Sequence, residues 1–379
     1  MEGRWNREIL DKLPYVMLDN LSGYCIYFIY RYGKYVWTCQ ICNVWHTKGS
    51  KMTFVPIAGI IVNMMARAKY KLDLADTYAE IRFAAFDTGV QIRAYGTADI
   101  CTPALEQAYA DCRRYEQLFS RTIPSSDISR INAAQSAWVE VNADTAELID
   151  RALAYCAASH GVFDITIGTA SRLWNLKEDI IPSAKALAEA VQHIDWRGVQ
   201  VNRSEDTARV RLDDPAAMID LGGIAKGWIA DALDHMLERA GVCTCVIDLG
   251  GNVLVRGEKP DGSPWKVGLP HPAQGHAGSA LAGTIELEGG SIVTSGIYER
   301  ACMHDGVLYH HVLSPRTGMP IETEYPAVSV ICERSIDAEG YSTTLLALGA
   351  KRGCELMAER PEILQAYFIS WNGEIQALR

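Results

Sequence analysis

From Ile81 to the C-terminus, apolar and polar residues repeat with two different periods, one typical of strands and one typical of helices. Strict alternation over residues 81–95 predicts a hairpin that turns at Asp87-Thr-Gly89. A helical period then predicts a helix from about residue 102 to residue 119. Beyond Gly241 most of the chain alternates with a period of two, which indicates strands. Together these periods predict an α+β fold with mixed, largely antiparallel sheets and packed helices.

Capping and turn residues mark the remaining elements. Asn142 is placed to cap a helix that Gly161 ends, and Ser183 to cap a short helix to about residue 192. Asn372-Gly373 predicts a type I′ turn in a closing hairpin. Further helices are predicted over residues 228–240 and 338–348, with another to 360. Strands are predicted on both sides of residues 202–207 and over residues 243–249, 253–256, 265–269, 283–287, 291–294 and 327–332.

Residues 1–78 differ from the rest of the chain. Residues 23–45 are rich in Tyr, Cys, Trp and Ile and show no clear period. The apolar run over residues 54–66, preceded by Lys51, has the length of a signal-peptide core. No cysteine follows it before Cys101, and no small-x-small cleavage site stands out. We therefore predict an N-terminal extension over residues 1–78, a folded domain over residues 79–379 and a cytoplasmic location, with export as the alternative.

Composition excludes several classes of protein. The chain has 379 residues, 49% hydrophobic and 22% charged, as in an ordinary soluble globular protein. A net charge of −10 argues against a nucleic-acid-binding surface. No apolar run reaches the roughly 18 residues of a membrane span, so we predict no integral membrane segment. Of the 11 cysteines, only Cys39 and Cys42 form a CxxC pair, which argues against structural zinc.

The stretch Asp220-Leu-Gly-Gly-Ile-Ala-Lys-Gly227 lies between an apolar approach and a predicted helix. Its two adjacent glycines allow close approach of the backbone to a ligand. Free N–H groups at a helix start favour an anion, and Lys226 adds a positive charge. The spacing matches neither the Walker pattern nor G-x-G-x-x-G. The stretch is therefore either a phosphate-facing element or a turn whose glycines serve packing.

Glu339 and Thr343 stand four residues apart in a predicted helix and so share one face. A carboxylate and a hydroxyl are hard oxygen ligands of the kind that Mg²⁺ prefers. The alternative is a first helical turn in which Glu339 complements the helix dipole and Ser342 and Thr343 are solvated.

Several blocks occur in the order found in one known family. Besides residues 220–227 they are Phe86-Asp-Thr88, Phe119-Ser120, Ser126-Asp-Ile-Ser-Arg-Ile-Asn132, Gly161-Val-Phe-Asp-Ile-Thr-Ile-Gly168, Asp248-Leu-Gly-Gly-Asn252, Thr294-Ser-Gly296, His310-His-Val-Leu-Ser-Pro-Arg-Thr-Gly318 and Ala338-Glu-Gly-Tyr-Ser-Thr343. From about Ile81 to its end the chain resembles the ApbE family of FAD:protein FMN transferases. The resemblance implies an ApbE-like fold for this part of the chain.

The resemblance also implies the site residues. Mg²⁺ would be held by the backbone carbonyl of Ala225 together with Glu339, Ser342 and Thr343, and His311 would lie next to the flavin and phosphates. Glu339 stands where the family usually has Asp, Thr122 where relatives often have an aromatic residue, and Phe86 where Met is usual. The residues expected to bind FAD are Phe86, Thr122, Phe163, Asp164, Ile165, Asp220, Lys226 and Val312.

The implied reaction is transfer of the FMN part of FAD, as substrate, to a Thr or Ser hydroxyl of an acceptor protein, with release of AMP. The acceptor would belong to a redox or electron-transport system. His311 is the expected base, with Glu339 as the alternative. Two other functions stay open: hydrolysis of FAD to FMN and AMP, and FAD binding without catalysis.

Overall fold

The computed structural model describes residues 26–31, 34–39, 70–204, 207–273 and 280–379. The chain divides into two compact units, Met1–Asn63 and Met64–Arg379. In the first unit the described residues form one antiparallel hairpin of β1 (Ile26–Arg31) and β2 (Lys34–Cys39). The apolar run at 54–66 and Cys42 lie outside the described residues.

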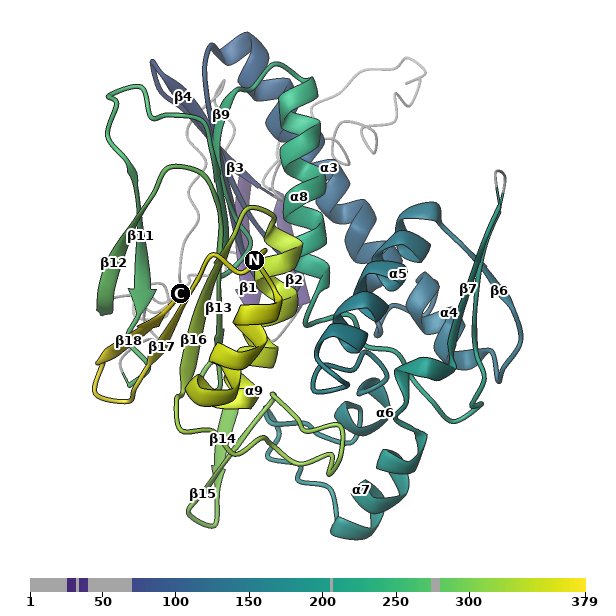
Figure 1. The fold of residues 1–379 in the computed structure, drawn as a ribbon. Helices are drawn as coiled ribbons and strands as arrows, with labels where there is room; N and C mark the ends of the chain where they lie inside the picture. The colour runs from purple at the N-terminus through teal and green to yellow at the C-terminus, as the bar shows by residue number, and fades with distance from the viewer. Residues whose placement is uncertain (1–25, 32–33, 40–69, 205–206, 274–279) are drawn as a thin grey trace, which may run out of the picture. The chain divides into compact units, whose positions relative to one another are not determined.

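A nine-stranded sheet forms the centre of the second unit (Figure 1). Its order is β18-β17-β16-β13-β10-β9-β5-β4-β3, and every neighbouring pair is antiparallel. The strands are β3 (Lys71–Leu74), β4 (Tyr78–Ala85), β5 (Thr88–Tyr95), β9 (Thr244–Asp248), β10 (Asn252–Arg256), β13 (Gly290–Gly296), β16 (Ala327–Cys332), β17 (Gln365–Ile369) and β18 (Ile375–Leu378).

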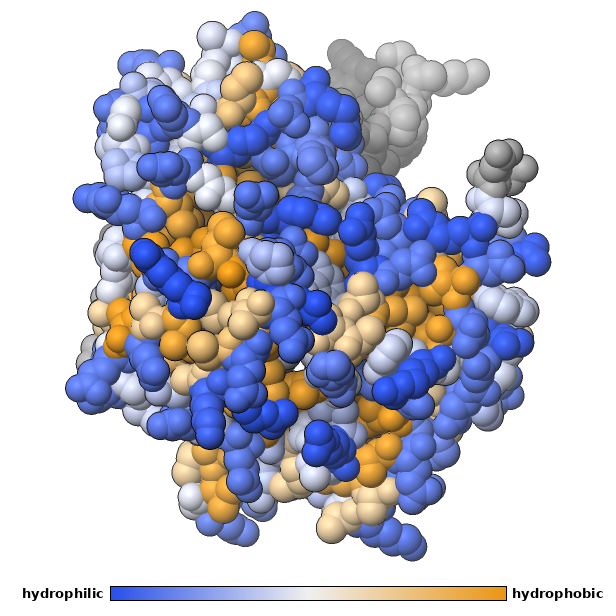
Figure 2. Space-filling view, in the orientation of Figure 1, coloured by the Kyte–Doolittle hydropathy of each residue, from blue (hydrophilic) through white to orange (hydrophobic). Residues whose placement is uncertain are grey.

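Both faces of this sheet are covered. Three helices pack on one face: α3 (Ala98–Phe119), α8 (Ala225–Arg239) and α9 (Ser335–Glu359). They bury the larger apolar cluster, whereas the hairpin of β11 (Trp265–Pro270) and β12 (Leu281–Leu287) covers a second cluster around Trp265 and Ile292. With these residues inside, the face seen in Figure 2 is largely hydrophilic, with apolar side chains in small patches.

The remaining elements form a smaller lobe and a projecting hairpin (Figure 1). The lobe holds α4 (Asp127–Ala133), β6 (Val139–Val141), α5 (Ala143–Ala158), α6 (Gly168–Ser171), α7 (Ala184–Ala190), η2 (Val191–His193), η3 (Trp196–Gly198), β7 (Val199–Arg203) and β8 (Ala208–Leu212). The hairpin is β14 (Ala301–His304) and β15 (Val307–His310). None of the helices in the described part of the chain is both long and apolar enough to cross a membrane.

The α+β fold class is confirmed, and most boundaries shift by a few residues. The first hairpin turns at Phe86 and Asp87, both with positive φ (54° and 59°), so the turn predicted at residues 87–89 is displaced. Helix α8 begins at Ala225, three residues before the predicted start, which places Lys226 and Gly227 in its first turn. The predicted type I′ turn is wrong, because only Gly373 of the pair has positive φ (84°) and the loop spans residues 370–374.

The strand β3 belongs to the sheet although the predicted extension included it. Lys71 pairs with Arg82 and Leu74 with Ala79, so β3 covers the edge of β4. The folded unit therefore starts before the boundary that we drew after residue 78.

We expect removal of residues 1–63 to leave the second unit folded, because that unit contains its own sheet and core. The truncated chain should keep one cooperative melt within a few degrees of the full chain. A shorter chain that starts at Ala75 is the matched control. It lacks β3, exposes the edge of β4 and should melt earlier. Loss of the cooperative melt in the first truncation would make residues 1–63 part of the fold.

Candidate active site

The first turns of α8 and α9 pack against each other and form the site. A Cβ on Gly227 would lie 2.6 Å from the carbonyl oxygen of Ser335, so only glycine allows this approach. Asp231 of α8 caps α9 from outside, since its carboxylate accepts from the N–H groups of Ser335 (2.7 Å) and Ile336 (3.0 Å). Burial raises the pKa of Asp231 to about 6. The relative position of the two helices is thus fixed at the site.

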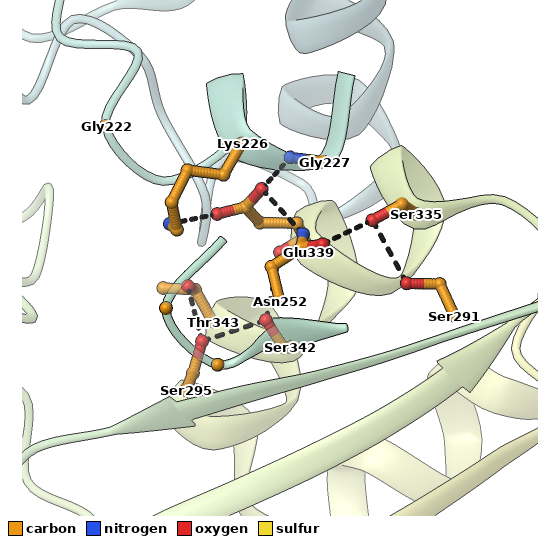
Figure 3. Close-up of polar contacts among 12 residues, drawn as sticks. Gly222, Lys226, Gly227, Asn252, Ser291, Ser295, Ser335, Glu339, Ser342 and Thr343 are labelled. Carbon is orange, nitrogen blue, oxygen red and sulfur yellow. Dashed lines mark hydrogen bonds and ion pairs between the residues drawn. The ribbon is translucent and has the colours of Figure 1, made fainter. Parts of the chain in front are cut away.

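Glu339 reaches across this junction from the second turn of α9 (Figure 3). Its carboxylate is buried, with 3% of the residue exposed. Oε1 pairs with Nζ of Lys226 at 2.5 Å. Oε2 accepts from the backbone N–H of Gly227 and from Nδ2 of Asn252 at 3.2 Å. Glu339 therefore complements the dipole of α8, whereas the alternative had assigned it to the first turn of its own helix.

Two hydroxyls follow Glu339 on α9. Ser295 of β13 bonds to Oγ of Ser342 at 2.8 Å and to Oγ1 of Thr343 at 3.1 Å. Oγ of Ser342 also donates to the carbonyl of Glu339 at 3.0 Å. Ser342 is fully buried, so the alternative in which it is solvated is wrong for that residue. Ser342 is thus joined to Glu339 through the backbone carbonyl of Glu339, and to Thr343 through Ser295.

The donor chemistry of this group fits Mg²⁺. The ammonium of Lys226 already pairs with Oε1 of Glu339, so this oxygen of the buried carboxylate is placed to bind a positive charge. Ala225 begins α8 beside Lys226, and its backbone carbonyl as a metal ligand stays a prediction. The described residues contain no cluster of three or more His, Cys, Asp or Glu that could hold a metal. The donor set is therefore one carboxylate and neutral oxygens, as suits an ion that keeps several waters.

His311 follows the β14–β15 hairpin and is half-buried. Its Nδ1 lies 3.2 Å from the carbonyl oxygen of Arg300, so Nδ1 carries the proton and Nε2 is left as an acceptor. Burial, aided by the charge of Arg300, lowers the pKa of His311 to about 3. The charge of Lys226 acts in the same direction, so the imidazole is neutral at pH 7 and, in the free protein, a weaker base than an ordinary histidine.

Asp220 lies on the approach to α8 and holds the turn in place. Its Oδ1 accepts from the N–H of Gly222 at 2.9 Å. Its Oδ2 pairs with Nε of Arg121 at 3.1 Å and accepts from Oγ of Ser171 at 3.1 Å. Thr122 is exposed beside Arg121, and its hydroxyl bonds to Ser120 at 3.0 Å. The structure therefore links the regions of Thr122 and Asp220, as a shared site requires.

Phe163, Asp164 and Ile165, the predicted FAD contacts, are buried in a loop that precedes α6. Asp164 accepts from the N–H and hydroxyl of Thr166, at 2.8 and 2.7 Å, and from the N–H of Trp196 at 3.2 Å. Burial raises the pKa of Asp164. Ile165 is fully buried and its carbonyl accepts from the N–H of Asp220 at 2.8 Å. Phe163 lies against Gly223, so this loop packs against the turn that precedes α8.

Phe86 and Val312 lie on other loops. The N–H of Phe86 donates to Glu116 at 3.0 Å, which holds the β4–β5 turn. Next to that turn, Thr88 contacts Gly250, two residues before Asn252. Val312 is buried beside His311, and its carbonyl accepts from Ile321 at 3.0 Å. Direct contact of either residue with FAD stays a prediction.

Four residues of the site were not singled out from the sequence. Asn252 donates to Glu339, and Ser335 donates to Asn252. Ser295 bonds to the hydroxyls of Ser342 and Thr343, and Arg121 pairs with Asp220. Asn252 and Ser295 lie inside blocks that carried the resemblance. Nothing in their spacing shows that Asn252 meets a residue 87 positions later.

We expect Gly227→Ala to destabilise the protein by about 2–3 kcal/mol, because the new methyl group would overlap the backbone of α9. The melting temperature, followed by circular dichroism, should fall by several degrees and FAD binding should weaken. Gly89→Ala is the control, since a Cβ there meets nothing within 4 Å. Equal melting temperatures of the two variants would show that the helices tolerate a wider spacing.

The chain is similar to known proteins in sequence and in fold. The model of the ApbE family matches residues 86–368. A FAD:protein FMN transferase of Treponema pallidum (strain Nichols) is 33% identical over 288 residues, 72% of this chain and 79% of the relative. One of Klebsiella pneumoniae (strain 342) is 35% identical over 266 residues, 69% and 81% of the two chains. The crystal structure of the ApbE protein from Thermotoga maritima superposes with a TM-score of 0.72 at 30% identity and covers 79% of this chain and 96% of its own.

The fold and these relatives define an enzyme of the transferase class. The chain belongs to the ApbE family. The resemblance read from the sequence blocks is thereby confirmed.

Proposed function

We propose that this chain is a flavin transferase that moves the FMN part of FAD to a Thr or Ser hydroxyl of an acceptor protein in a Mg²⁺-dependent reaction. The observation that carries the proposal is the α8–α9 junction, where a buried carboxylate, a lysine and a helix N-terminus meet and two hydroxyls follow on the next turn of α9. The names of the relatives, FAD:protein FMN transferases, support the same substrate.

Three groups of residues have different roles in this reaction: phosphate binding, metal binding and orientation of FAD. Lys226 and the N-terminus of α8 bind the pyrophosphate and neutralise its charge. Ala225, Glu339, Ser342 and Thr343 would hold Mg²⁺, which would supply positive charge to offset that of the phosphates. The buried loop at 163–165 and the turn at Phe86 orient the adenine and flavin ends.

His311 removes the proton from the acceptor hydroxyl at its free Nε2. The hydroxyl oxygen forms a bond to the phosphorus on the riboflavin side, and the bond from that phosphorus to the oxygen shared with the AMP phosphate breaks. AMP leaves with the electron pair, and FMN remains on the acceptor as a phosphoester. A bound anionic phosphate raises the pKa of the imidazole from its low value, which strengthens the base.

The acceptor is proposed to belong to a redox or electron-transport system, and the cytoplasmic location also stays a prediction. Neither is needed for the chemistry of the site.

Separation of products tests the proposal. The purified chain is incubated with FAD, Mg²⁺ and a panel of peptides that each carry one Thr or Ser, with Val in that position as the control. We expect peptide-bound FMN and AMP from a hydroxyl peptide, and no bound FMN from its Val counterpart or in excess chelator. Free FMN and AMP without bound flavin would indicate a hydrolase, and unchanged FAD would indicate a protein that only binds it.

A further inference from the structure

We propose, resting on the function above, that Asn252 sets the metal preference of the site. By holding Oε2 of Glu339 it leaves only Oε1 for the metal, which favours Mg²⁺ over Ca²⁺.

The side chain of Asn252 is locked in one orientation. Asn252 begins β10 and has 1% of its surface exposed. Its Oδ1 accepts from Oγ of Ser335 at 2.7 Å, so its Nδ2 donor faces Oε2 of Glu339 at 3.2 Å. Rotation of the amide by half a turn would place its donor against a hydroxyl that donates to it and its oxygen against a carboxylate.

The hydrogen bonds that orient Asn252 extend to a residue of the sheet (Figure 3). Oγ of Ser335 also accepts from Oγ of Ser291 at 3.0 Å, and Ser291 lies in β13 and is fully buried. The chain Ser291–Ser335–Asn252 therefore ties Glu339 to β13, to the start of α9 and to β10. Each member of such a buried chain strengthens the orientation of the next.

The two carboxylate oxygens of Glu339 are consequently unequal. Oε2 is held by Asn252 and by the backbone N–H of Gly227, both on rigid elements. Among the residues that the structure describes, Lys226 alone holds Oε1, and it is a long side chain that is 24% exposed. The side chain of Lys226 can turn from Oε1 toward a phosphate, whereas the amide of Asn252 and the backbone of Gly227 are held in place beside Oε2. Oε1 is therefore the oxygen that becomes free when the substrate binds.

A carboxylate with one free oxygen discriminates between cations. Ca²⁺ takes six to eight oxygens and often takes both oxygens of one carboxylate, whereas Mg²⁺ is smaller and needs a strict octahedron. Occupation of both lone pairs of Oε2, by Asn252 and by the N–H of Gly227, removes the two-oxygen contact and so penalises Ca²⁺. Loss of the Asn252 amide would leave Gly227 as the one donor to Oε2, and the freed lone pair would improve Ca²⁺ binding relative to Mg²⁺.

Titration calorimetry of the full chain with FAD tests this inference, with Mg²⁺ and Ca²⁺ as probes. We expect Asn252→Ala to lower the ratio of the Ca²⁺ to the Mg²⁺ dissociation constant about tenfold. Ser335→Ala, which frees the amide to rotate, should lower it less. Ser329→Ala is the control, because that buried hydroxyl pairs with Thr294 at 2.7 Å and makes no contact with Glu339, and the ratio should not change. A general structural defect would weaken both ions together and leave the ratio unchanged.

An unchanged ratio in folded Asn252→Ala and Ser335→Ala, with Mg²⁺ still bound by the unaltered chain, would overturn the inference and leave the proposed function intact. If Asn252→Ala does not fold, Ser335→Ala alone decides. Absence of Mg²⁺ binding in the unaltered chain would overturn both the inference and the magnesium part of the proposed function.

Discussion

Glu339→Ala is expected to lower flavin transfer by roughly 10²–10³-fold, because it removes the one carboxylate from the group of residues proposed to bind magnesium. The change also leaves Lys226 and the N–H of Gly227 without their partner. We expect the melting temperature to fall, since breaking a half-buried ion pair leaves one charge uncompensated. Transfer is measured as peptide-bound FMN at saturating FAD and Mg²⁺.

Asp337→Ala is the control for this variant. Asp337 lies two residues earlier on the same helix, but its carboxylate accepts from the hydroxyl of Tyr155, away from Lys226. It should lose some stability and keep its transfer rate. A Glu339→Ala protein that transfers FMN at the unaltered rate would remove Glu339 from the magnesium site.

Glu339→Asp separates reach from charge in the same experiment. The glutamate spans from α9 to both Lys226 and Gly227, so the pocket is built for the longer side chain. The shorter aspartate should fall short and lower transfer about tenfold, equivalent to about 1.4 kcal/mol. Faster transfer by Glu339→Asp would show instead that the pocket suits the family's usual residue.

His311→Asn is expected to lower the rate of transfer by roughly 10²–10⁴-fold while FAD binding changes little, because it removes the base. The asparagine amide can still donate to the carbonyl of Arg300, as Nδ1 does. The loop should therefore keep its shape, and the loss should appear in kcat. A kcat equal to that of the unaltered chain would assign the base elsewhere, with Glu339 as the next candidate.

The pH dependence of the unaltered enzyme has a definite sign. Because burial and Arg300 lower the pKa of His311 to about 3, the free imidazole stays neutral as the pH falls from 7 to 5. His311 should thus contribute little loss of kcat/KM over that range, whereas an ordinary histidine with a pKa of about 6.5 would cost more than roughly tenfold. A loss of that size centred near pH 6.5, absent from His311→Asn, would contradict the lowered pKa.

Local pattern predicted most of the elements but not their ends, and it missed α4, β6, β14 and β15. The caps Asn142 and Ser183 are confirmed, because each side chain accepts from an N–H two or three residues on, as a cap does. The start of α8 was missed because Ile224 provides no capping side chain. Its first turn is completed by Glu339 of another helix, and a partner 112 residues away leaves no local signal.

The site was predictable where its residues share one element. Glu339 and Thr343 were grouped by helical spacing and Ser342 by the family resemblance, and the structure bonds the two hydroxyls to one serine of β13. Asn252 and Ser335 could not be grouped with them, because their contacts arise only when β10 lies across the start of α9. The carboxylate oxygens of Asp164 accept from the N–H groups of Thr166 and Trp196 and from the hydroxyl of Thr166, and its contact with the ligand stays a prediction.

The central claim is that flavin transfer takes place at the junction of α8 and α9. Its most direct test is a crystal structure of the full chain with FAD and Mn²⁺, in which the anomalous signal locates the metal. We predict a manganese peak at Oε1 of Glu339 and the hydroxyl of Thr343, with Lys226 turned from Glu339 to the pyrophosphate and the riboflavin-side phosphorus facing Nε2 of His311. A metal or pyrophosphate bound elsewhere, with Lys226 still paired to Glu339, would contradict the account.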